Sequence, residues 1–140
     1  MRAAQVAAIR ELYEEAGVLL ARFAAKPGPG GQLVGEETVQ PLQQYRSAVD
    51  RGEFAFSRLV AEAGLVLAGD CLVHFGHWIT PNMMPKRFDT HFFIALAPAG
   101  QVAEQDGRET TEAVWINPGA ALEQEKNGEA IIIFPTRMNL

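Results

Sequence analysis

Near the start of the chain, residues 10–18 read RELYEEAGV, and this segment is the most informative about the fold. An α-helix turns by about 100° per residue, so Glu11, Glu14 and Glu15 share one face of a predicted helix. The opposite face carries apolar side chains, which are Val6, Ile9, Leu12 and Tyr13. Like charges at this spacing disfavour an isolated helix, and a cation that prefers oxygen ligands would relieve their repulsion. The segment therefore predicts a helix whose acidic face either binds a metal ion or is solvated.

The whole segment resembles a known motif. RELYEEAGV is similar to the second half of the Nudix box, G-x5-E-x7-R-E-U-x-E-E-x-G-U, in which U is aliphatic. In that family the glutamates that match Glu11, Glu14 and Glu15 hold Mg²⁺ or Mn²⁺, and the arginine that matches Arg10 orients the first glutamate. Arg10 could instead be an ordinary helix partner of Glu14. The resemblance implies a Nudix hydrolase, with an α/β fold in which helices sandwich a mixed sheet. Such an enzyme cleaves the diphosphate linkage of a nucleoside diphosphate derivative.

A second resemblance covers most of the chain. The segments 4–20, 77–81 (HWITP), 87–93 (RFDTHFF) and 109–120, in this order, look like the Nudix branch that contains the peroxisomal coenzyme A diphosphatase. The resemblance implies that coenzyme A or acyl-coenzyme A is split into a 3′,5′-ADP product and a phosphopantetheine product. That branch has a helical insertion after the box, and the loop and helices predicted over 22–63 fit it. We therefore expect a single, partial Nudix domain over residues 1–140.

The first half of the box has no counterpart in this chain. Eight residues before Arg10 stands Arg2 where the motif has glutamate, and the glycine would precede Met1. One alternative is therefore a non-catalytic Nudix-like fragment or degenerate domain that acts in binding or assembly. Another is an acidic helix without a metal in an unrelated α+β domain. The opening strands of the fold would also be missing, and a homodimer would cover the exposed sheet edge.

Further site residues are expected outside the box. The resemblance assigns an additional acidic role to Glu109, with Glu112 as the second choice. Lys86 and Arg87 are the only adjacent cations and are candidates to bind a substrate phosphate. Strand alternation puts Arg87 on the same face as Asp89 and His91, so an Arg–Asp surface pair is the other interpretation. The opposite, apolar face of that strand, which includes Phe88 and Ile94, is expected in the core.

Two other patterns favour packing over chemistry. Cys71, His74 and His77 have a spacing that could suggest zinc, but in a strand His74 points away from the other two. Trp78 and Trp115 could stack on a nucleobase, although large aromatic residues in strands are more often part of the core.

Composition limits the remaining classes of function. The 140 residues are 48% hydrophobic and 21% charged, which suits one globular domain. The net charge is −5 and the Lys and Arg residues are scattered, so nucleic acid is not expected as a partner. No apolar run is long enough to span a membrane. Cys71 is the only cysteine, which excludes an intrachain disulfide and fits a cytoplasmic location.

The periodicity of the remaining residues predicts the other elements. Helices are expected over 3–16, 36–49 and 53–63, and the first of them should end at Gly17. A further helix should begin at Asn117-Pro118 and end at Gly128, and the start of a terminal helix that is cut short is expected from Pro135. Strands are expected within 65–79, with a break at Gly69-Asp70, and over 87–97, 110–116 and 130–134. A surface loop is expected over 26–31.

Overall fold

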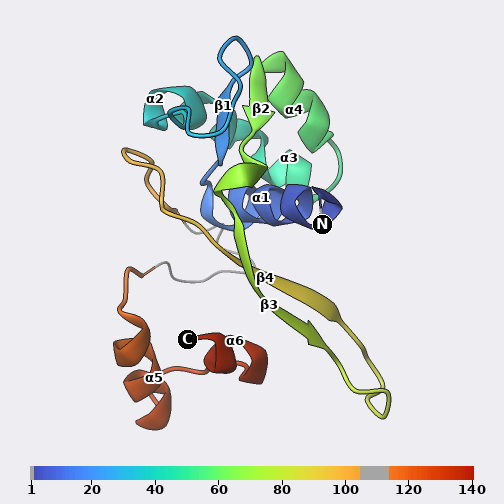
Figure 1. Ribbon diagram of the computed structural model, residues 1–140, viewed down its shortest axis with the longest axis vertical. Helices are drawn as coiled ribbons and strands as arrows, with labels where there is room; N and C mark the ends of the chain where they lie inside the picture. The colour runs from blue at the N-terminus through green and yellow to red at the C-terminus, as the bar shows by residue number, and fades with distance from the viewer. Residues whose placement is uncertain (1, 105–113) are drawn as a thin grey trace. The chain divides into compact units, whose positions relative to one another are not determined.

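The computed structural model describes residues 2–104 and 114–140 of the chain (Figure 1). The chain divides into two compact units. The first unit contains residues 1–74 and 93–113, and the second contains residues 75–92 and 114–140. Among the described residues, none of the helices has the length and apolar character that a membrane span needs.

The first unit opens with helix α1, Arg2–Ala16. Ile9 and Tyr13, one helical turn apart, are fully buried and anchor the helix to the core. Val6, expected on the same apolar face, is 48% exposed and lies at its edge. Gly17 ends the helix with a φ of 68°, a left-handed conformation that glycine adopts without strain. The predicted helix and its stop are confirmed.

A two-stranded antiparallel sheet follows, made of β1, Ala21–Phe23, and β2, Leu65–Leu67. In its register Ala21 lies opposite Leu67 and Phe23 lies opposite Leu65. The strands are far apart in sequence because residues 24–64 intervene between them. This intervening segment contains the helices that the sequence assigned to an insertion.

The helix expected over 36–49 is divided into three short pieces. They are α2, Glu36–Val39, the 3₁₀-helix η1, Gln40–Tyr45, and α3, Arg46–Asp50. Pro41 stands in the first turn of η1, where its missing N–H cannot continue the hydrogen-bond ladder of α2. The prediction of one continuous helix is therefore wrong in detail.

The next helix, α4, begins later than expected and covers Phe56–Glu62. Before it, the backbone N–H groups of Glu53 and Phe54 both donate to the carbonyl of Ala48, at 2.8 and 3.0 Å. These two residues still belong to the turn at Gly52, whose φ is 70°. The turn thus delays the helix that was predicted from residue 53.

A second two-stranded sheet pairs β3, Val73–Ile79, with β4, Asp89–Ile94. A short 3₁₀-helix, η2 (Gly69–Cys71), separates β2 from β3, which confirms the expected break. The apolar face predicted for the strand over 87–97 was expected in the core, and this is wrong. Phe88, just before β4, is 55% exposed and Ile94, at its end, is 58% exposed. Strand alternation identifies a face but does not provide a layer to cover it.

The second unit ends in two helices. Helix α5, Pro118–Lys126, is capped as expected, with the Asn117 side chain accepting from the N–H of Gly119 at 2.9 Å. The prediction of a strand over 130–134 is wrong. Residues 130–133 belong to no strand, and helix α6, Phe134–Asn139, begins directly after them. Residues 114–116 also lie outside any strand, and the rest of the strand expected there falls outside the described residues.

The buried core lies entirely in the first unit. Its largest fully buried side chains are Tyr13, Ile9, Leu19, Leu20 and Val39. None of the described residues of the second unit is buried. Trp115, expected in the core, is 83% exposed, whereas the half-buried Trp78 meets the ring of Phe134 edge-on at 5.6 Å.

Candidate functional site

The acidic face of α1 is organised by Arg10. Its Nη2 lies 3.2 Å from Oε1 of Glu11, and its Nε lies 3.5 Å from Oε1 of Glu14. The Glu14 side chain is 13% exposed, whereas that of Glu11 is 57% exposed. Arg10 thus makes both contacts that the sequence left as alternatives, one with the first glutamate and one with its helix partner.

The donors on this face are suited to a hard divalent cation. Glu11, Glu14 and Glu15 offer only carboxylate oxygens, the ligands that Mg²⁺ and Mn²⁺ prefer. Their oxygens are not gathered within 4.8 Å of one another in the part of the chain that the structure describes. The chemistry of the donors therefore fits such an ion, and new side-chain rotamers would be needed for all three to bind it together.

Tyr13 fixes the buried side of the same helix. Its hydroxyl donates to the carbonyl of Leu42 at 2.6 Å, and its ring lies 5.8 Å from that of Phe56. Burial raises the pKa of Tyr13 to about 12. The phenol is therefore a neutral hydrogen-bond donor at physiological pH, and it ties α1 to the segment predicted as an insertion.

The C-terminal end of α1 is held by side chains from that segment. Arg46 donates to the carbonyl of Glu14 from Nε at 3.3 Å and Nη2 at 3.1 Å, and its Nη2 also reaches the carbonyl of Glu104 at 3.0 Å. Gln43 donates to the carbonyl of Gly17 at 2.7 Å. A Cβ on Gly17 would approach the end of the Gln43 side chain to 2.9 Å, so a larger residue there would displace this amide. The backbone below the glutamates is therefore firmly positioned.

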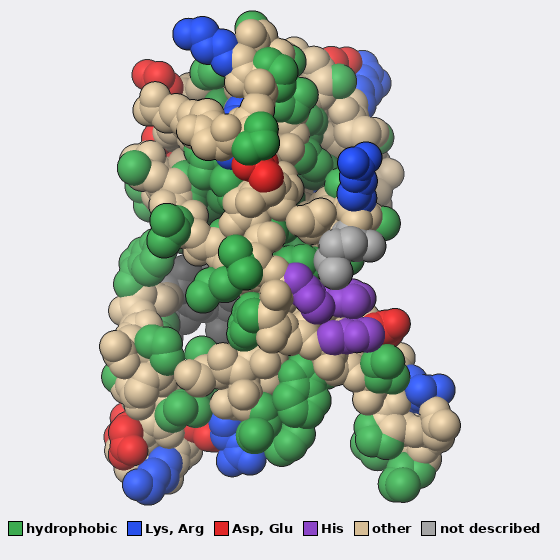
Figure 2. Space-filling view, in the orientation of Figure 1, with side chains coloured by type: hydrophobic (Ala, Val, Ile, Leu, Met, Phe, Trp, Pro, Cys, Tyr) green, Lys and Arg blue, Asp and Glu red, His purple; other side chains and the backbone are tan. Residues whose placement is uncertain are grey.

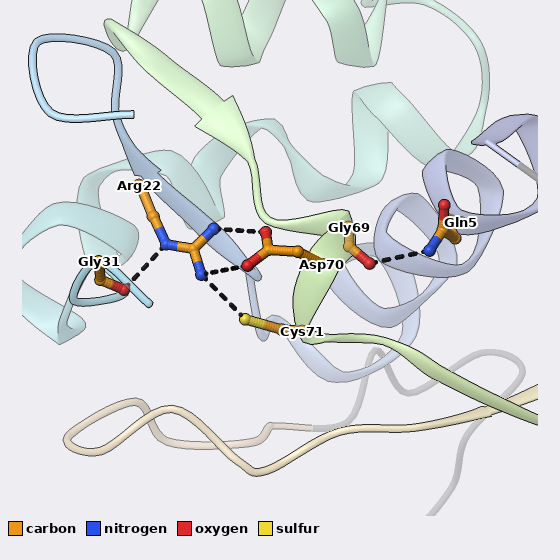
Figure 3. Close-up of polar contacts among 6 residues, drawn as sticks. All are labelled: Gln5, Arg22, Gly31, Gly69, Asp70 and Cys71. Atoms are coloured by element: carbon orange, nitrogen blue, oxygen red, sulfur yellow. Dashed lines mark hydrogen bonds and ion pairs between the residues drawn. The ribbon is translucent and has the colours of Figure 1, made fainter. Parts of the chain in front are cut away.

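Arg22 forms the most buried polar cluster (Figure 3). It is 4% exposed and pairs with Asp70 through two contacts, Nη1–Oδ1 at 2.6 Å and Nη2–Oδ2 at 2.9 Å. It also donates to the carbonyl of Gly31 at 2.8 Å and to Sγ of Cys71 at 3.2 Å. The hydrogen bond from Arg22 lowers the pKa of Asp70. These contacts hold the surface loop and η2 against β1, a role that the sequence analysis missed because Arg22 stands in an apolar run.

The two cations proposed for phosphate binding lie in the second unit and have local contacts. Arg87 donates from Nε to the carbonyl of Thr80 at 3.0 Å. Lys86 lies over the ring of Phe88, with Nζ 5.0 Å from its centroid. Both cations remain at the exposed turn between β3 and β4. The other predicted site residues, Glu109 and Glu112, lie outside the described residues.

A cluster that the sequence analysis did not predict joins the two strands of this sheet. His77 of β3 places Nε2 2.5 Å from Oδ1 of Asp89, and His91 of β4 places Nε2 3.9 Å from the same oxygen. The two imidazole rings are stacked, with centroids 4.1 Å apart and planes 7° apart. Figure 2 shows imidazole side chains gathered at the surface beside an acidic one. The hydrogen bond from His77 lowers the pKa of Asp89, so this carboxylate is ionised at neutral pH.

The cluster was missed because it depends on strand register. Alternation puts Asp89 and His91 on one face of their strand, but it does not show that His77 of β3 lies beside them. In the structure Cys71 accepts from Arg22, and the ring of His74 lies 5.3 Å from that of Phe93. The expected pairing of Arg87 with Asp89 is replaced by the contact between Asp89 and His77.

Comparison with known proteins identifies relatives over nearly the whole chain. The family model described as the NUDT19 Nudix domain matches residues 2–140. The "Acyl-coenzyme A diphosphatase NUDT19" of Xenopus laevis is 30% identical over an alignment of 132 residues that covers 89% of this chain and 35% of that protein. The protein of the same name from Homo sapiens is 32% identical over an alignment of 123 residues that covers 85% of this chain and 33% of that protein. The chain thus spans about a third of the length of these curated relatives.

A solved structure agrees with this assignment. The crystal structure of a Nudix hydrolase from Alicyclobacillus acidocaldarius matches with a TM-score of 0.73 and 27% identity, over 95% of this chain and 57% of that one. The helices and small antiparallel sheets described above therefore represent an α/β Nudix fold, and the expected fold class is confirmed.

Proposed function

This chain belongs to the NUDT19 Nudix domain family, and we propose that it carries the metal-binding part of a diphosphatase that acts on coenzyme A or acyl-coenzyme A. The observation that carries the proposal is the acidic face of α1, where Arg10 holds Glu11 and the shielded Glu14 together. The names of the relatives support the substrate class. Those relatives are longer proteins, of which this chain covers about a third.

The residues of α1 have distinct proposed roles. Glu11, Glu14 and Glu15 would hold Mg²⁺ or Mn²⁺, since their oxygens match the preference of these ions. When bound, such an ion offsets charge on the diphosphate oxygens and favours ionisation of a water nucleophile. Arg10 limits the movement of Glu11 and Glu14 through its two contacts. The anchored backbone of α1 keeps these side chains on one face.

Residues outside α1 are also proposed to take part in the function. Lys86 and Arg87 would contact phosphate oxygens of the substrate, for which their exposed cationic groups are suited. Glu109 would supply a further carboxylate, as the resemblance implies. The present contacts of Lys86 with the Phe88 ring and of Arg87 with the Thr80 carbonyl could be replaced by contacts with phosphate, because such exposed contacts contribute little to stability.

A second candidate is a Nudix-like domain that binds without catalysis. It is favoured by the separation of the three glutamate side chains. Such a protein would bind Mg²⁺ weakly and would not hydrolyse coenzyme A. The two candidates therefore differ in two measurable properties.

The test is the substitution Glu15→Gln, with Glu37→Gln as a matched control that removes the same charge from the exposed face of α2. Hydrolysis of coenzyme A in Mg²⁺ or Mn²⁺ should fall by about a hundredfold or more, because a catalytic metal contributes several kcal/mol to the barrier. Calorimetry should show weaker Mn²⁺ binding by Glu15→Gln and unchanged thermal unfolding. Unchanged turnover in Glu15→Gln would contradict the proposal, and no turnover with weak Mg²⁺ affinity in the unaltered chain would favour the second candidate.

We also propose that residues 1–140 form part of one Nudix domain, with residues 22–63 as an insertion, in a cytoplasmic protein. Each sheet in the described residues has two strands, so every strand retains an unpaired edge. A homodimer would cover such an edge, and light scattering that shows only monomer would argue against it. The scattered cations give no basis for a nucleic-acid partner.

A further inference from the structure

Three ligand-bearing side chains meet on the strand pair of the second unit. His77 comes from β3, and Asp89 and His91 come from β4, two residues apart on the same strand face. One ligand atom from each side chain lies within 4.8 Å of the other two. Among the described residues, they are the only three histidine, cysteine, aspartate or glutamate residues gathered this closely.

The donors define the class of ion that would fit. Two imidazole nitrogens and one carboxylate oxygen form a borderline donor set that suits Zn²⁺, Co²⁺ or Ni²⁺. Mg²⁺ prefers oxygen ligands and keeps much of its water, so it should compete poorly here. Oδ1 of Asp89 lies 2.5 Å from Nε2 of His77 and 3.9 Å from Nε2 of His91, which places a carboxylate oxygen beside both nitrogens.

The side chains need only local adjustment to converge on an ion. Zn–N and Zn–O bonds are about 2.0–2.2 Å, which places ligand atoms about 3.4 Å apart around a tetrahedral ion. Nε2 of His77 and Oδ1 of Asp89, now 2.5 Å apart, would move apart, and Nε2 of His91, 3.9 Å from the same oxygen, would move closer. The stacked rings are nearly parallel, at 7°, and would have to tilt toward a common point. Neither ring is locked in a core, because His77 is 39% and His91 is 30% exposed at the side chain. Exposure also leaves room for water to complete the coordination.

We propose that His77, Asp89 and His91 form a binding site for a divalent transition metal of the zinc class. The bound ion would link β3 to β4. The site uses no residue of α1 and differs from the acidic face in its donors. An ion bound there links the two strands through side chains as well as through the backbone. It thereby steadies the turn that carries Lys86 and Arg87.

The site can be tested by titrating the full chain with Co²⁺ in the presence of excess Mg²⁺ and following the visible absorption of bound Co²⁺. The unaltered chain should show saturable binding, and Zn²⁺ should displace the Co²⁺. His77→Ala and His91→Ala should each weaken binding by about tenfold or more, since even outer-shell changes at metal sites have effects of this size. His74→Ala is the matched control, because His74 contacts Phe93 and is not a member of the cluster.

Two further measurements separate loss of metal binding from loss of the fold. Far-UV circular dichroism of each variant shows whether the fold is retained, and His77→Gln and His91→Gln replace the alanine variants if it is not. In the unaltered chain, the nitrogen chemical shifts of His77 and His91 should change on adding Zn²⁺. No binding of Co²⁺ or Zn²⁺, or an equal loss in His74→Ala and His77→Ala, would overturn the proposal. Glu15→Gln should leave this Co²⁺ binding unchanged, so the site can fail or succeed independently of the diphosphatase proposal.

Discussion

The two compact units differ in how they are stabilised. In the first, apolar side chains from α1, β1, β2 and the intervening helices are buried together in one core. In the second, none of the described residues is buried, and the contacts are cross-strand and edge-on contacts at half-exposed side chains. Hydrophobic burial scales with area removed from water, so most of the folding free energy should reside in the first unit.

The same difference separates the two groups of ligand-bearing residues. The glutamates of α1 stand on a helix whose other face is anchored by Ile9 and Tyr13. The histidine cluster stands on a strand pair without such an anchor. The backbone that carries the glutamates is therefore fixed before any ion binds, whereas the strand pair would gain rigidity from binding one. The comparison therefore predicts that substitutions affect the two units very unequally.

The largest effect on stability is expected for Ile9→Ala. Ile9 is fully buried beneath the acidic face, and removing its side chain leaves a cavity in a packed core. The free energy of unfolding should fall by about 2–4 kcal/mol, measured by urea denaturation. Coenzyme A hydrolysis should fall with it at temperatures near the new midpoint. A loss below 1 kcal/mol would mean that Ile9 does not lie in a tightly packed core, and the proposed difference in stabilisation between the two units would not hold.

A smaller effect is expected for Asp70→Ala, which leaves the buried guanidinium of Arg22 without its carboxylate. Breaking a fully buried pair costs about 3–5 kcal/mol, and because the Asp70 side chain is 38% exposed we expect about 1–3 kcal/mol. Arg22→Met should cost less, since water can solvate the remaining carboxylate. An equal or larger loss in Arg22→Met would contradict this asymmetry.

The same pair gives a pH dependence whose sign follows from Asp70. Its pKa is lower in the folded chain than in the unfolded one, so the pair stabilises the fold above the unfolded value of about 3.9. That contribution is lost as the pH falls through the folded value. The difference in unfolding free energy between the unaltered chain and Asp70→Ala should thus be full at neutral pH and shrink in acid below about pH 4. Urea titrations across this range measure it.

The smallest effect is expected for Ile79→Ala, the same chemical change as Ile9→Ala made in the second unit. Ile79 ends β3 and is 56% exposed, so little apolar area is lost from burial. The expected loss is about 1 kcal/mol or less, mostly from strand preference. A cost equal to that of Ile9→Ala would show that β3 is covered by a further surface, and the contrast between the units would not hold.

The sequence predicted what depends on local patterns. The acidic face, the burial of Ile9 and Tyr13 and the stop at Gly17 follow from helical periodicity and one glycine. The cap at Asn117 follows from a known side-chain preference. These features need no knowledge of distant residues, and all were confirmed.

Features that depend on distant pairing could not be predicted. Residues 130–133 have an apolar, strand-like composition, but a strand also needs a neighbour, and the chain enters α6 instead. Trp115 has the size of a core residue and is exposed. The meeting of His77 with Asp89 and His91 depends on how β3 and β4 are aligned, which alternation within one strand does not specify.

The cap on α1 has a practical consequence for protein engineering. Arg46 and Gln43, both from the segment proposed as an insertion, bind carbonyls at the end of this helix. A cation at a helix C-terminus also interacts favourably with the aligned backbone dipoles. Trimming that segment to make a minimal domain would leave these carbonyls without their partners, directly below Glu14 and Glu15. A shortened chain would therefore need a replacement cap designed into it.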